Sequence, residues 1–404
     1  MVVPDRSLPT RKNGEDSEVT DYDRGVRVSL IDPVSYTLPY DTSLASALAR
    51  RGHEVDLIAA AFAHGAAPEA VGFRRHDLFF TVSARLLARR PRSRARFAVK
   101  GLEYLPELLR ADREITRLDP EIVHVQWLGI PDVDRHWLRR LARRRGLVFT
   151  AHDVLPRRTE RRLELWRTIF ATVDRVVVHG AAAVERLTEL GVPPERIVRI
   201  PHPLFTGPGD ELRPPNGRTL LHFGFLRSAK GLDVLLRALP GIAAEVPDVR
   251  LVVAGDPLEP VEGLERLAAE LGVAPYVEWR LGYVADAEIP GLLEQATALV
   301  LPYRKIESSG VLATALGHGR PAVVSDVGSL GETVREFGAG LVVPPEDPDA
   351  LAAACVRLLL DAKAREDAFR GTERARRELS WDAAAEAHER LYADVLRDRL
   401  LRTA

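Results

Sequence analysis

The chain has 404 residues, of which 46% are hydrophobic and 28% are charged, and its net charge at pH 7 is −1. This length predicts two domains of roughly 150–200 residues each. No stretch approaches the roughly 18 consecutive apolar residues of a membrane-spanning helix. The single cysteine, Cys355, excludes an internal disulfide framework and a cysteine-based metal cluster, and we expect it to be buried.

Residues 1–24 are polar and contain no apolar core segment, so we expect a disordered leader rather than a signal peptide. These features together favour a cytoplasmic protein, with a peripheral position on the inner face of a membrane left open. The near-neutral total conceals two halves of opposite charge. Residues 25–205 carry 30 Lys and Arg against 21 Asp and Glu, whereas residues 206–404 carry 23 against 31. Such an asymmetry predicts an anionic partner for the first half rather than a particular fold.

The first half alternates between apolar runs and helical patterns. Strands are expected at 26–32, 54–59, 122–126, 147–152, 175–178 and 196–200, and helices at 44–51, 132–145, 160–172 and 181–190. Alternation of this kind predicts a doubly wound parallel sheet with helices on both faces.

A linker at 201–215 contains five prolines and two glycines, and a second series of elements follows it. Strands are expected at 220–224, 249–254, 277–280, 298–301, 322–325 and 341–343, and helices at 232–246, 262–271, 286–295 and 381–400. The sequence therefore predicts an α/β protein with two Rossmann-like domains, residues 25–205 and 216–380, followed by a helical segment at 381–404. Ligands of such sheets bind at the carboxyl ends of the strands, so the cleft between the domains is the expected site.

The first motif is Gly224–Gly231 (GFLRSAKG), which joins a strand to a helix. Glycines allow the backbone to approach a ligand, and the start of a helix offers free N–H groups to an anion. Lys230 adds a positive charge, so the segment predicts a diphosphate site. An ordinary strand–helix turn with an exposed lysine fits the spacing equally well.

The second motif is Glu307–Val311 (ESSGV), which also precedes a helix. Backbone N–H groups of Ser309, Gly310 and Val311 could bind phosphate there. Simple capping of the helix by Ser308 or Ser309 is the alternative.

A third motif, Thr150–Val154 (TAHDV), places His152 and Asp153 at the end of an expected strand, where they would face the cleft. A structural role for this histidine is about as well supported. Arg89–Lys100 contains six basic residues and no acidic one, which suits either an anionic membrane surface or a solvated basic loop. Asp132–Asp134 has the Asp-x-Asp pattern of a metal site, but at a helix start capping is the better interpretation.

Taken together, these motifs resemble retaining glycosyltransferases of family 4, which have the GT-B fold. The resemblance extends from Val26 to Leu400, is thinner in the first half, and rests on the following segments: Gly224–Gly231, Leu251–Gly255, Gly282-Tyr283, Leu301–Tyr303, Gly319–Gly328 with Glu332, Gly340–Asp349 and Ser380-Trp381.

The resemblance implies a nucleotide-sugar donor substrate, with no metal and no cofactor. Lys230 would hold the donor diphosphate together with the helix start at Ser309 and Gly310, and His152 would contact the transferred sugar, which makes Lys230 and His152 the catalytic residues. Arg280 and Tyr283 would lie by the nucleobase, and residues 381–404 would cross back to the first domain. The other implied donor-binding residues are Gly224, Phe225, Arg227, Glu307, Val311 and Thr314. The implied acceptor-side residues are Tyr36, Gln126, Trp127 and Asp153.

Two departures from the family pattern concern the donor. Phe225 stands where the family often has arginine, with Arg227 as the nearest substitute. Ile306 and Thr314 stand where two glutamates are common, and Glu307 is displaced by one residue. The expected function is retaining, metal-independent transfer of a hexose from a nucleotide sugar to an unknown acceptor, anionic or lipid-linked. An epimerase of the same fold and a binding module without catalysis are the alternatives, and no nucleic-acid partner is expected.

Overall fold

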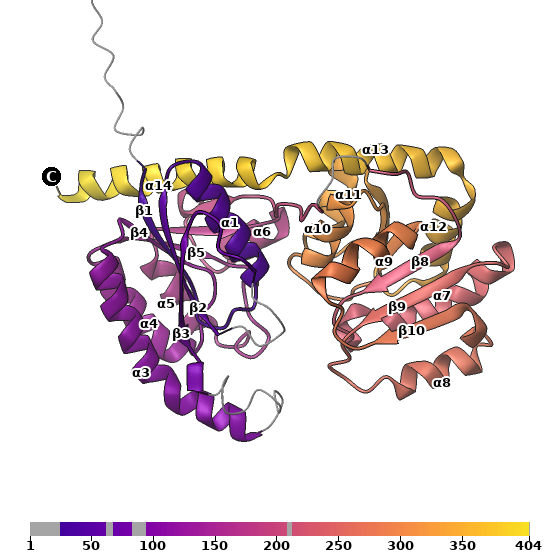
Figure 1. Ribbon diagram of the computed structural model, residues 1–404, viewed down its shortest axis with the longest axis horizontal. Helices are drawn as coiled ribbons and strands as arrows, with labels where there is room; N and C mark the ends of the chain where they lie inside the picture. The colour runs from indigo at the N-terminus through magenta and orange to yellow at the C-terminus, as the bar shows by residue number, and fades with distance from the viewer. Residues whose placement is uncertain (1–24, 62–67, 83–93, 208–211, 404) are drawn as a thin grey trace, which may run out of the picture.

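The computed structural model describes residues 25–61, 68–82, 94–207 and 212–403, which form two α/β domains joined by two crossings of the chain (Figure 1). The first domain contains a parallel sheet of seven strands in the order β3-β2-β1-β4-β5-β6-β7. Its strands are β1 Arg27–Asp32, β2 Glu54–Ala60, β3 Arg74–Phe79, β4 Ile122–Val125, β5 Gly146–Thr150, β6 Arg175–Val178 and β7 Ile197–Arg199. Its helices are α1 Leu38–Arg50, α3 Arg94–Leu118, α4 Pro131–Ala142, α5 Leu163–Thr172 and α6 Ala181–Glu189.

The second domain contains a parallel sheet of six strands in the order β10-β9-β8-β11-β12-β13. Its strands are β8 Thr219–Phe223, β9 Arg250–Gly255, β10 Val277–Leu281, β11 Ala298–Leu301, β12 Ala322–Ser325 and β13 Gly340–Val343. Its helices are α7 Leu232–Glu245, α8 Glu262–Glu270, α9 Ile289–Gln295, α10 Gly310–Gly317, α11 Ser329–Phe337, α12 Pro348–Leu360 and α13 Ala362–Glu378. The predicted α/β class with two doubly wound sheets is confirmed.

Two elements of the first domain were not predicted. Strand β3 begins Arg74-Arg75-His76-Asp77, a polar run that is stable at the sheet edge because Arg74 forms two hydrogen bonds to Asp56 on the neighbouring strand, both at 2.8 Å. Helix α3 begins in the basic segment Arg89–Lys100 and continues through Pro106. The solvated-loop interpretation of that segment is therefore wrong for residues 94–100, while residues 89–93 lie outside the described part of the chain.

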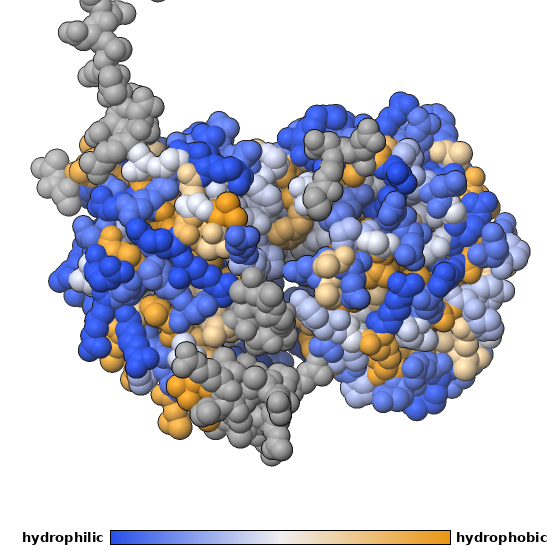
Figure 2. Space-filling view, in the orientation of Figure 1, coloured by the Kyte–Doolittle hydropathy of each residue, from blue (hydrophilic) through white to orange (hydrophobic). Residues whose placement is uncertain are grey.

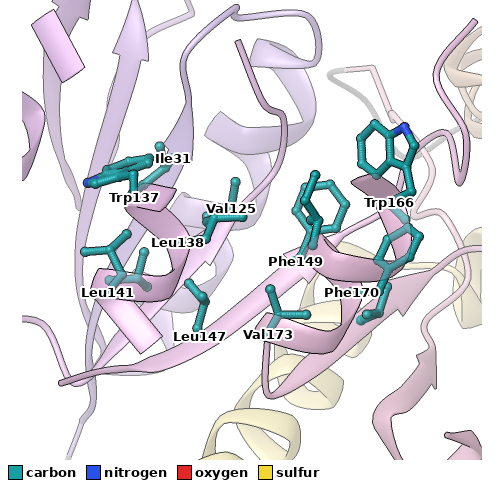
Figure 3. Close-up of a cluster of buried hydrophobic side chains, with 14 of the residues drawn as sticks. Ile31, Val125, Trp137, Leu138, Leu141, Leu147, Phe149, Trp166, Phe170 and Val173 are labelled. Carbon is teal, nitrogen blue, oxygen red and sulfur yellow. The ribbon is translucent and has the colours of Figure 1, made fainter. Parts of the chain in front are cut away.

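The core of the first domain is built from apolar strands and the inner faces of the helices that cover them (Figure 3). Trp137 and Leu141 of α4 belong to the same buried cluster as Leu147 of β5, and Phe149 of the same strand meets Trp166 of α5. Each such side chain contributes roughly 1.5–3 kcal/mol when removed from water. In the second domain Cys355 is buried within α12, as expected.

The two crossings between the domains run side by side. The amide of Leu204, in the first crossing, donates a 2.8 Å hydrogen bond to the carbonyl of Leu379, in the return crossing. Phe205 packs against the ring of Trp381, and the chain then enters α14, Trp381–Thr403. Helix α14 packs on α1 and β5 of the first domain, where Leu391 and Val395 join its core.

Among the residues that the structure describes, no helix is long and apolar enough to cross a membrane.

Candidate functional site

The loop after β8 is shaped by glycines that approach other backbone segments closely. Gly224 has a φ of +115°, and Gly231 has a φ of +64°. A Cβ on Gly231 would lie 1.9 Å from the carbonyl oxygen of Pro302, and one on Gly255 would lie 1.8 Å from that of Gly224. No side chain can replace hydrogen at these contacts, so the loop is held against the ends of β9 and β11.

Lys230 is the central cation of this loop. Its ammonium nitrogen lies 3.7 Å from the ring centroid of the buried Tyr303, and it forms no salt bridge within the described residues. Burial, and secondarily the charge of Arg227, lower the pKa of Lys230 to about 7, while Asp153 opposes this shift. A largely buried cation without a paired carboxylate favours an incoming anion.

Arg227 and Phe225 lie on the exposed side of the same loop. Phe225 is 42% exposed and occupies the place where the family often has a cation. The guanidinium of Arg227 is near enough to lower the pKa of Lys230 and to counter the rise in that of Asp153. Positive charge is thus present beside Lys230 despite the substitution at Phe225.

Arg304 supports the loop after β8 through hydrogen bonds, and it was not among the predicted residues. It donates to the carbonyl of Ser228 at 2.7 Å and to both carboxylate oxygens of Asp233 at 2.8 Å. Its own amide donates to the carbonyl of Ala229 at 3.0 Å, and its Nε to Glu346 at 2.9 Å. Spacing gives no signal for this role, because the partners come from segments distant in sequence.

The second predicted helix start is that of α10. The hydroxyl of Ser309 accepts a 3.3 Å hydrogen bond from the amide of Leu312, so Ser309 does cap the helix. The amides of Gly310 and Val311 precede the first intrahelical hydrogen bonds and remain available to an anion. Thr314 donates to the carbonyl of Gly310 at 2.7 Å, so its hydroxyl proton is committed to its own helix.

His152 is a buried ring at the carboxyl end of β5. Its ring stacks on Trp127 with centroids 5.4 Å apart and meets the edge of Tyr40 at 4.9 Å. Nε2 lies 2.9 Å from Oε1 of Gln126, and Nδ1 lies 3.2 Å from Nε2 of His179. Burial lowers the pKa of His152 well below its usual range, so the ring is neutral at pH 7.

The direction of this hydrogen-bond chain follows from the carbonyl of Ile200, which can only accept. His179 Nδ1 lies 2.9 Å from that oxygen and must donate, so its Nε2 accepts from Nδ1–H of His152. Nε2 of His152 is then unprotonated and requires a donor. The amide nitrogen of Gln126, otherwise without a partner in the described structure, supplies one when it faces the ring.

The predicted acceptor-side residues surround this ring. Tyr36 is 74% exposed and lies 5.5 Å from Trp127, whose indole N–H donates to Thr37 at 2.9 Å. Asp153 faces the second domain: burial raises its pKa, and the charges of Arg227, Lys305 and Lys230 act in the opposite direction.

A buried carboxyl pair, not predicted, supports the loop that carries Tyr36. Asp32 accepts from the amides of Val34 at 3.0 Å and Ser35 at 2.8 Å, and its carboxyl is hydrogen-bonded to that of Asp41. Burial raises the pKa of both groups, and the neighbouring charge of Asp32 raises that of Asp41 further. The pKa of Asp41 is raised further than that of Asp32, so Asp41 is the carboxyl of the pair that takes up a proton first as the pH falls.

The predicted site residues with charged side chains, and Tyr283 with them, fall into two sets, one between the domains and one at the edge of the second sheet. Asp153 of the first domain lies near Glu307, Lys230 and Arg227 of the second, since burial and the charge of Asp153 raise the pKa of Glu307. Lys305 also pairs with Glu160 across the domains at 3.0 Å.

The other set, Arg280 and Tyr283, lies at the edge strand β10. Arg280 donates to Glu278 at 2.6 Å, and Tyr283 is 49% exposed.

Asp134 accepts from Tyr104 at 2.6 Å and from the amide of Ile130 at 2.8 Å, which agrees with a capping role. No group of three or more His, Cys, Asp or Glu residues in the described ranges could hold a metal ion.

Comparison with known proteins matches both halves of the chain to glycosyltransferase families. Residues 217–361 match Glycosyl transferases group 1, and residues 42–206 match Glycosyltransferase Family 4. The chain is 27% identical over 394 residues to a phosphatidyl-myo-inositol mannosyltransferase of Mycolicibacterium smegmatis, covering 92% of this chain and 94% of that protein. It is 31% identical over 246 residues to a D-inositol 3-phosphate glycosyltransferase of Thermomonospora curvata, covering 54% and 56%.

Solved structures show the same architecture. Sucrose-phosphate synthase from Thermosynechococcus elongatus superposes with a TM-score of 0.70 at 22% identity, covering 92% of this chain and 100% of that one. HepE of Anabaena, in complex with UDP and glucose, gives 0.68 at 16% identity, covering 91% and 100%. The two facing sheets are those of the GT-B fold, and the chain is a glycosyltransferase that belongs to family 4, the glycosyl transferases of group 1.

Proposed function

We propose that the protein transfers a hexose from a nucleotide-diphosphate sugar to an anionic or lipid-linked acceptor, with retention of configuration and without a metal ion. The observation that carries this proposal is Lys230. It is a largely buried cation without a salt bridge in the described structure, set between two glycines and facing Asp153 of the other domain. A diphosphate placed there would meet Lys230, Arg227 and the free amides of Gly310 and Val311.

Electrostatic stabilisation of the leaving group is the proposed source of catalysis. When the bond between the anomeric carbon and the diphosphate oxygen breaks, its electron pair goes to that oxygen. Lys230 and the amino end of α10 lie where they can stabilise this charge, and fixed charges of this kind need no reorganisation during the reaction. The acceptor hydroxyl oxygen then bonds to the anomeric carbon from the same face, and its proton passes to the departing diphosphate oxygen, which gives retention.

His152 is proposed to bind the transferred sugar as a neutral hydrogen-bond acceptor. Its Nδ1–H is committed to His179, so Nε2 is the atom that a sugar hydroxyl would reach in place of the Gln126 amide. Trp127 and Tyr36, beside it, offer aromatic surface to the acceptor. Arg280 and Tyr283 are proposed to lie near the nucleobase.

An anionic acceptor is supported by charge and by relatives. The first half of the chain carries 30 basic against 21 acidic residues. The two relatives described above are named for acceptors that contain a phosphate group, a phosphatidylinositol and an inositol phosphate.

The direct test is incubation with UDP-, GDP- and ADP-hexoses, with and without EDTA, followed by measurement of nucleotide release. Slow release from one donor without acceptor, unchanged by EDTA, is the expected result. Loss of release with EDTA would contradict the metal-independent mechanism. Isomerised nucleotide sugar would indicate the epimerase instead, and binding without turnover would indicate a binding module.

A further inference from the structure

Away from the site, the outward face of α3 combines exposed leucines with arginines. Leu102, Leu105 and Leu109 are 80%, 54% and 46% exposed, and their spacing places them on one side of the helix. The exposed arginines Arg110, Arg113 and Arg117 follow on the same helix. Isolated exposed leucines are common on proteins, but three along one helical face form a continuous apolar stripe.

The acidic residues of α3 neutralise only part of this face. Glu114 pairs with Arg117, and Asp112 pairs with Arg140 of α4, whereas Arg110 and Arg113 form no salt bridge within the described residues. Glu107 is buried and accepts from the amides of Phe80 at 2.6 Å and Thr81 at 3.1 Å. Asp112 accepts from the indole N–H of Trp137 at 3.1 Å. None of the helix's carboxylates belongs to its fully exposed residues; they are Glu103, Glu107, Asp112 and Glu114.

Helix α4 extends the positive charge beside the stripe. A pocket of about 210 Å³ lies between α3 and α4, and Arg140, Arg144 and Arg145 line it together with Asp112. Further exposed arginines of α4 and the turn after it are Arg139 and Arg143. Apolar and basic side chains therefore share one surface of the first domain.

This surface reaches the edge of the sheet that carries the site. The amides of Phe80, Thr81 and Val82 directly follow β3 and donate to Glu103 and Glu107, near the middle of α3. This part of the helix, with its leucines, therefore lies at the carboxyl ends of the strands, the edge that also carries His152. Figure 2 shows hydrophobic residues along the lower end of this domain, next to strongly hydrophilic ones.

We propose that the outward face of α3, with the adjacent arginines of α4, is a docking surface for an anionic lipid bilayer. The leucines would enter the boundary between headgroups and acyl chains, and the arginines would bind lipid phosphates. The charge of this surface favours a bilayer over a neutral protein partner. Delivery of a lipid acceptor to the cleft rests on the proposed transferase function, whereas docking itself does not.

Flotation of the full-length protein with phosphatidylcholine vesicles, with and without phosphatidylglycerol, tests the proposal. The protein should float only with phosphatidylglycerol. Joint substitution Leu102→Gln, Leu105→Gln and Leu109→Gln should weaken partitioning at least about tenfold, because the apolar insertion is lost. Joint substitution Arg110→Gln, Arg113→Gln and Arg117→Gln should weaken it by a similar factor, as should 1 M salt, where the screening length falls to about 3 Å.

Matched controls use residues of similar exposure elsewhere. Val71→Gln, Leu360→Gln and Leu401→Gln, at 60%, 47% and 72% exposed, control for the leucines. Arg266→Gln, Arg370→Gln and Arg377→Gln control for the arginines. Controls should bind like the original protein, and all variants should keep donor hydrolysis without vesicles. No flotation with phosphatidylglycerol, or equal losses in the controls, would overturn docking. Flotation without any donor turnover would contradict the transferase proposal alone.

Discussion

The two domains place opposite kinds of chemistry at equivalent sheet edges. The edge of the second domain presents charge, with Lys230 and Arg227 on a loop fixed by glycines and by Arg304. The edge of the first domain suppresses charge, because burial keeps His152 and His179 neutral and raises the pKa of the carboxyls of Asp32 and Asp41. One fold therefore supports two environments, and the side chains after the strands decide which.

This difference indicates a division of roles. A diphosphate leaving group needs positive charge beside it, and the second domain supplies Lys230 and Arg227, the charged form of Lys230 being favoured further when a diphosphate binds. A sugar and a neutral hydroxyl acceptor need hydrogen-bond partners of fixed direction, and the chain from Ile200 through His179 to His152 supplies those. Each prediction below alters one side of the comparison.

Lys230→Ala should have the largest effect. Removal of the loop's buried cation should lower kcat/KM for nucleotide release by about 10³-fold, on the order of 4 kcal/mol, because the leaving charge loses its nearest partner. Lys363→Ala, which removes a lysine exposed on α13 and paired with Asp367, is the control and should leave turnover unchanged. Near-native activity of Lys230→Ala, with its thermal stability intact, would overturn the proposed mechanism.

Arg304→Lys should weaken donor binding by roughly 10- to 30-fold while leaving most of the fold intact. Lysine keeps the charge but cannot bridge the Ser228 carbonyl and both oxygens of Asp233 at once, so the loop loses its support. Nucleotide titration by calorimetry measures the effect. Arg370→Lys, on the exposed face of α13, is the matched control, and equal affinities in both variants would remove Arg304 from the site.

Donor binding should depend on pH through Lys230. Its free pKa is about 7, and a bound diphosphate favours the charged form, so binding takes up a proton. Affinity should be constant below pH 7 and fall by up to about tenfold per unit above it. Calorimetry in buffers of different ionisation enthalpy detects the proton. Lys230→Arg stays charged and should lose this dependence, so an unchanged pH profile in that variant would assign the effect to another group.

The smallest predicted effect concerns stability in acid. Burial lowers the pKa of His179 to about 4 and that of His202 to about 3, below the roughly 6.5 of an unfolded histidine. The unfolded chain therefore binds more protons as pH falls from about 6.5, and the free energy of unfolding decreases.

Urea denaturation at several pH values measures this decrease. His179→Gln should cost about 1–2 kcal/mol at pH 7.5 through its lost hydrogen bonds, yet show a shallower decline toward pH 5. His136→Gln, at an exposed position on α4, should follow the original protein. An equally steep decline in His179→Gln would exclude this ring as a source of acid sensitivity.

Most of the fold could be predicted because its strands are short apolar runs separated by helical patterns. Strand β12, Ala322–Ser325, was predicted to the residue. Strand β3 was missed because charged residues dominate it, and its stability depends on pairing with Asp56. Helix α3 was missed as a whole, because a run of arginines begins it and Pro106 lies inside it.

The candidate site was easiest to propose from the sequence where backbone geometry restricts residue type. Gly224 stands out because its φ of +115° favours glycine, and Gly231 because a Cβ there would collide with the Pro302 carbonyl; the adjacent Lys230 is recognised with them. Arg304 could not be found in this way, since its partner Asp233 is 71 residues away and the pairing depends on the folded domain. The same holds for His179, whose contact with His152 joins the ends of neighbouring strands.

The return of α14 to the first domain has a consequence for biosynthesis. His124 and Tyr392 share a 2.8 Å hydrogen bond although 268 residues separate them, and Leu391 and Val395 close the core around β1. During synthesis, the first domain therefore keeps apolar surface exposed until the second domain and α14 have been translated. The first domain cannot complete its core before the second has been synthesised, and a nascent chain interrupted within α13 would be a client for chaperones rather than a half-active enzyme.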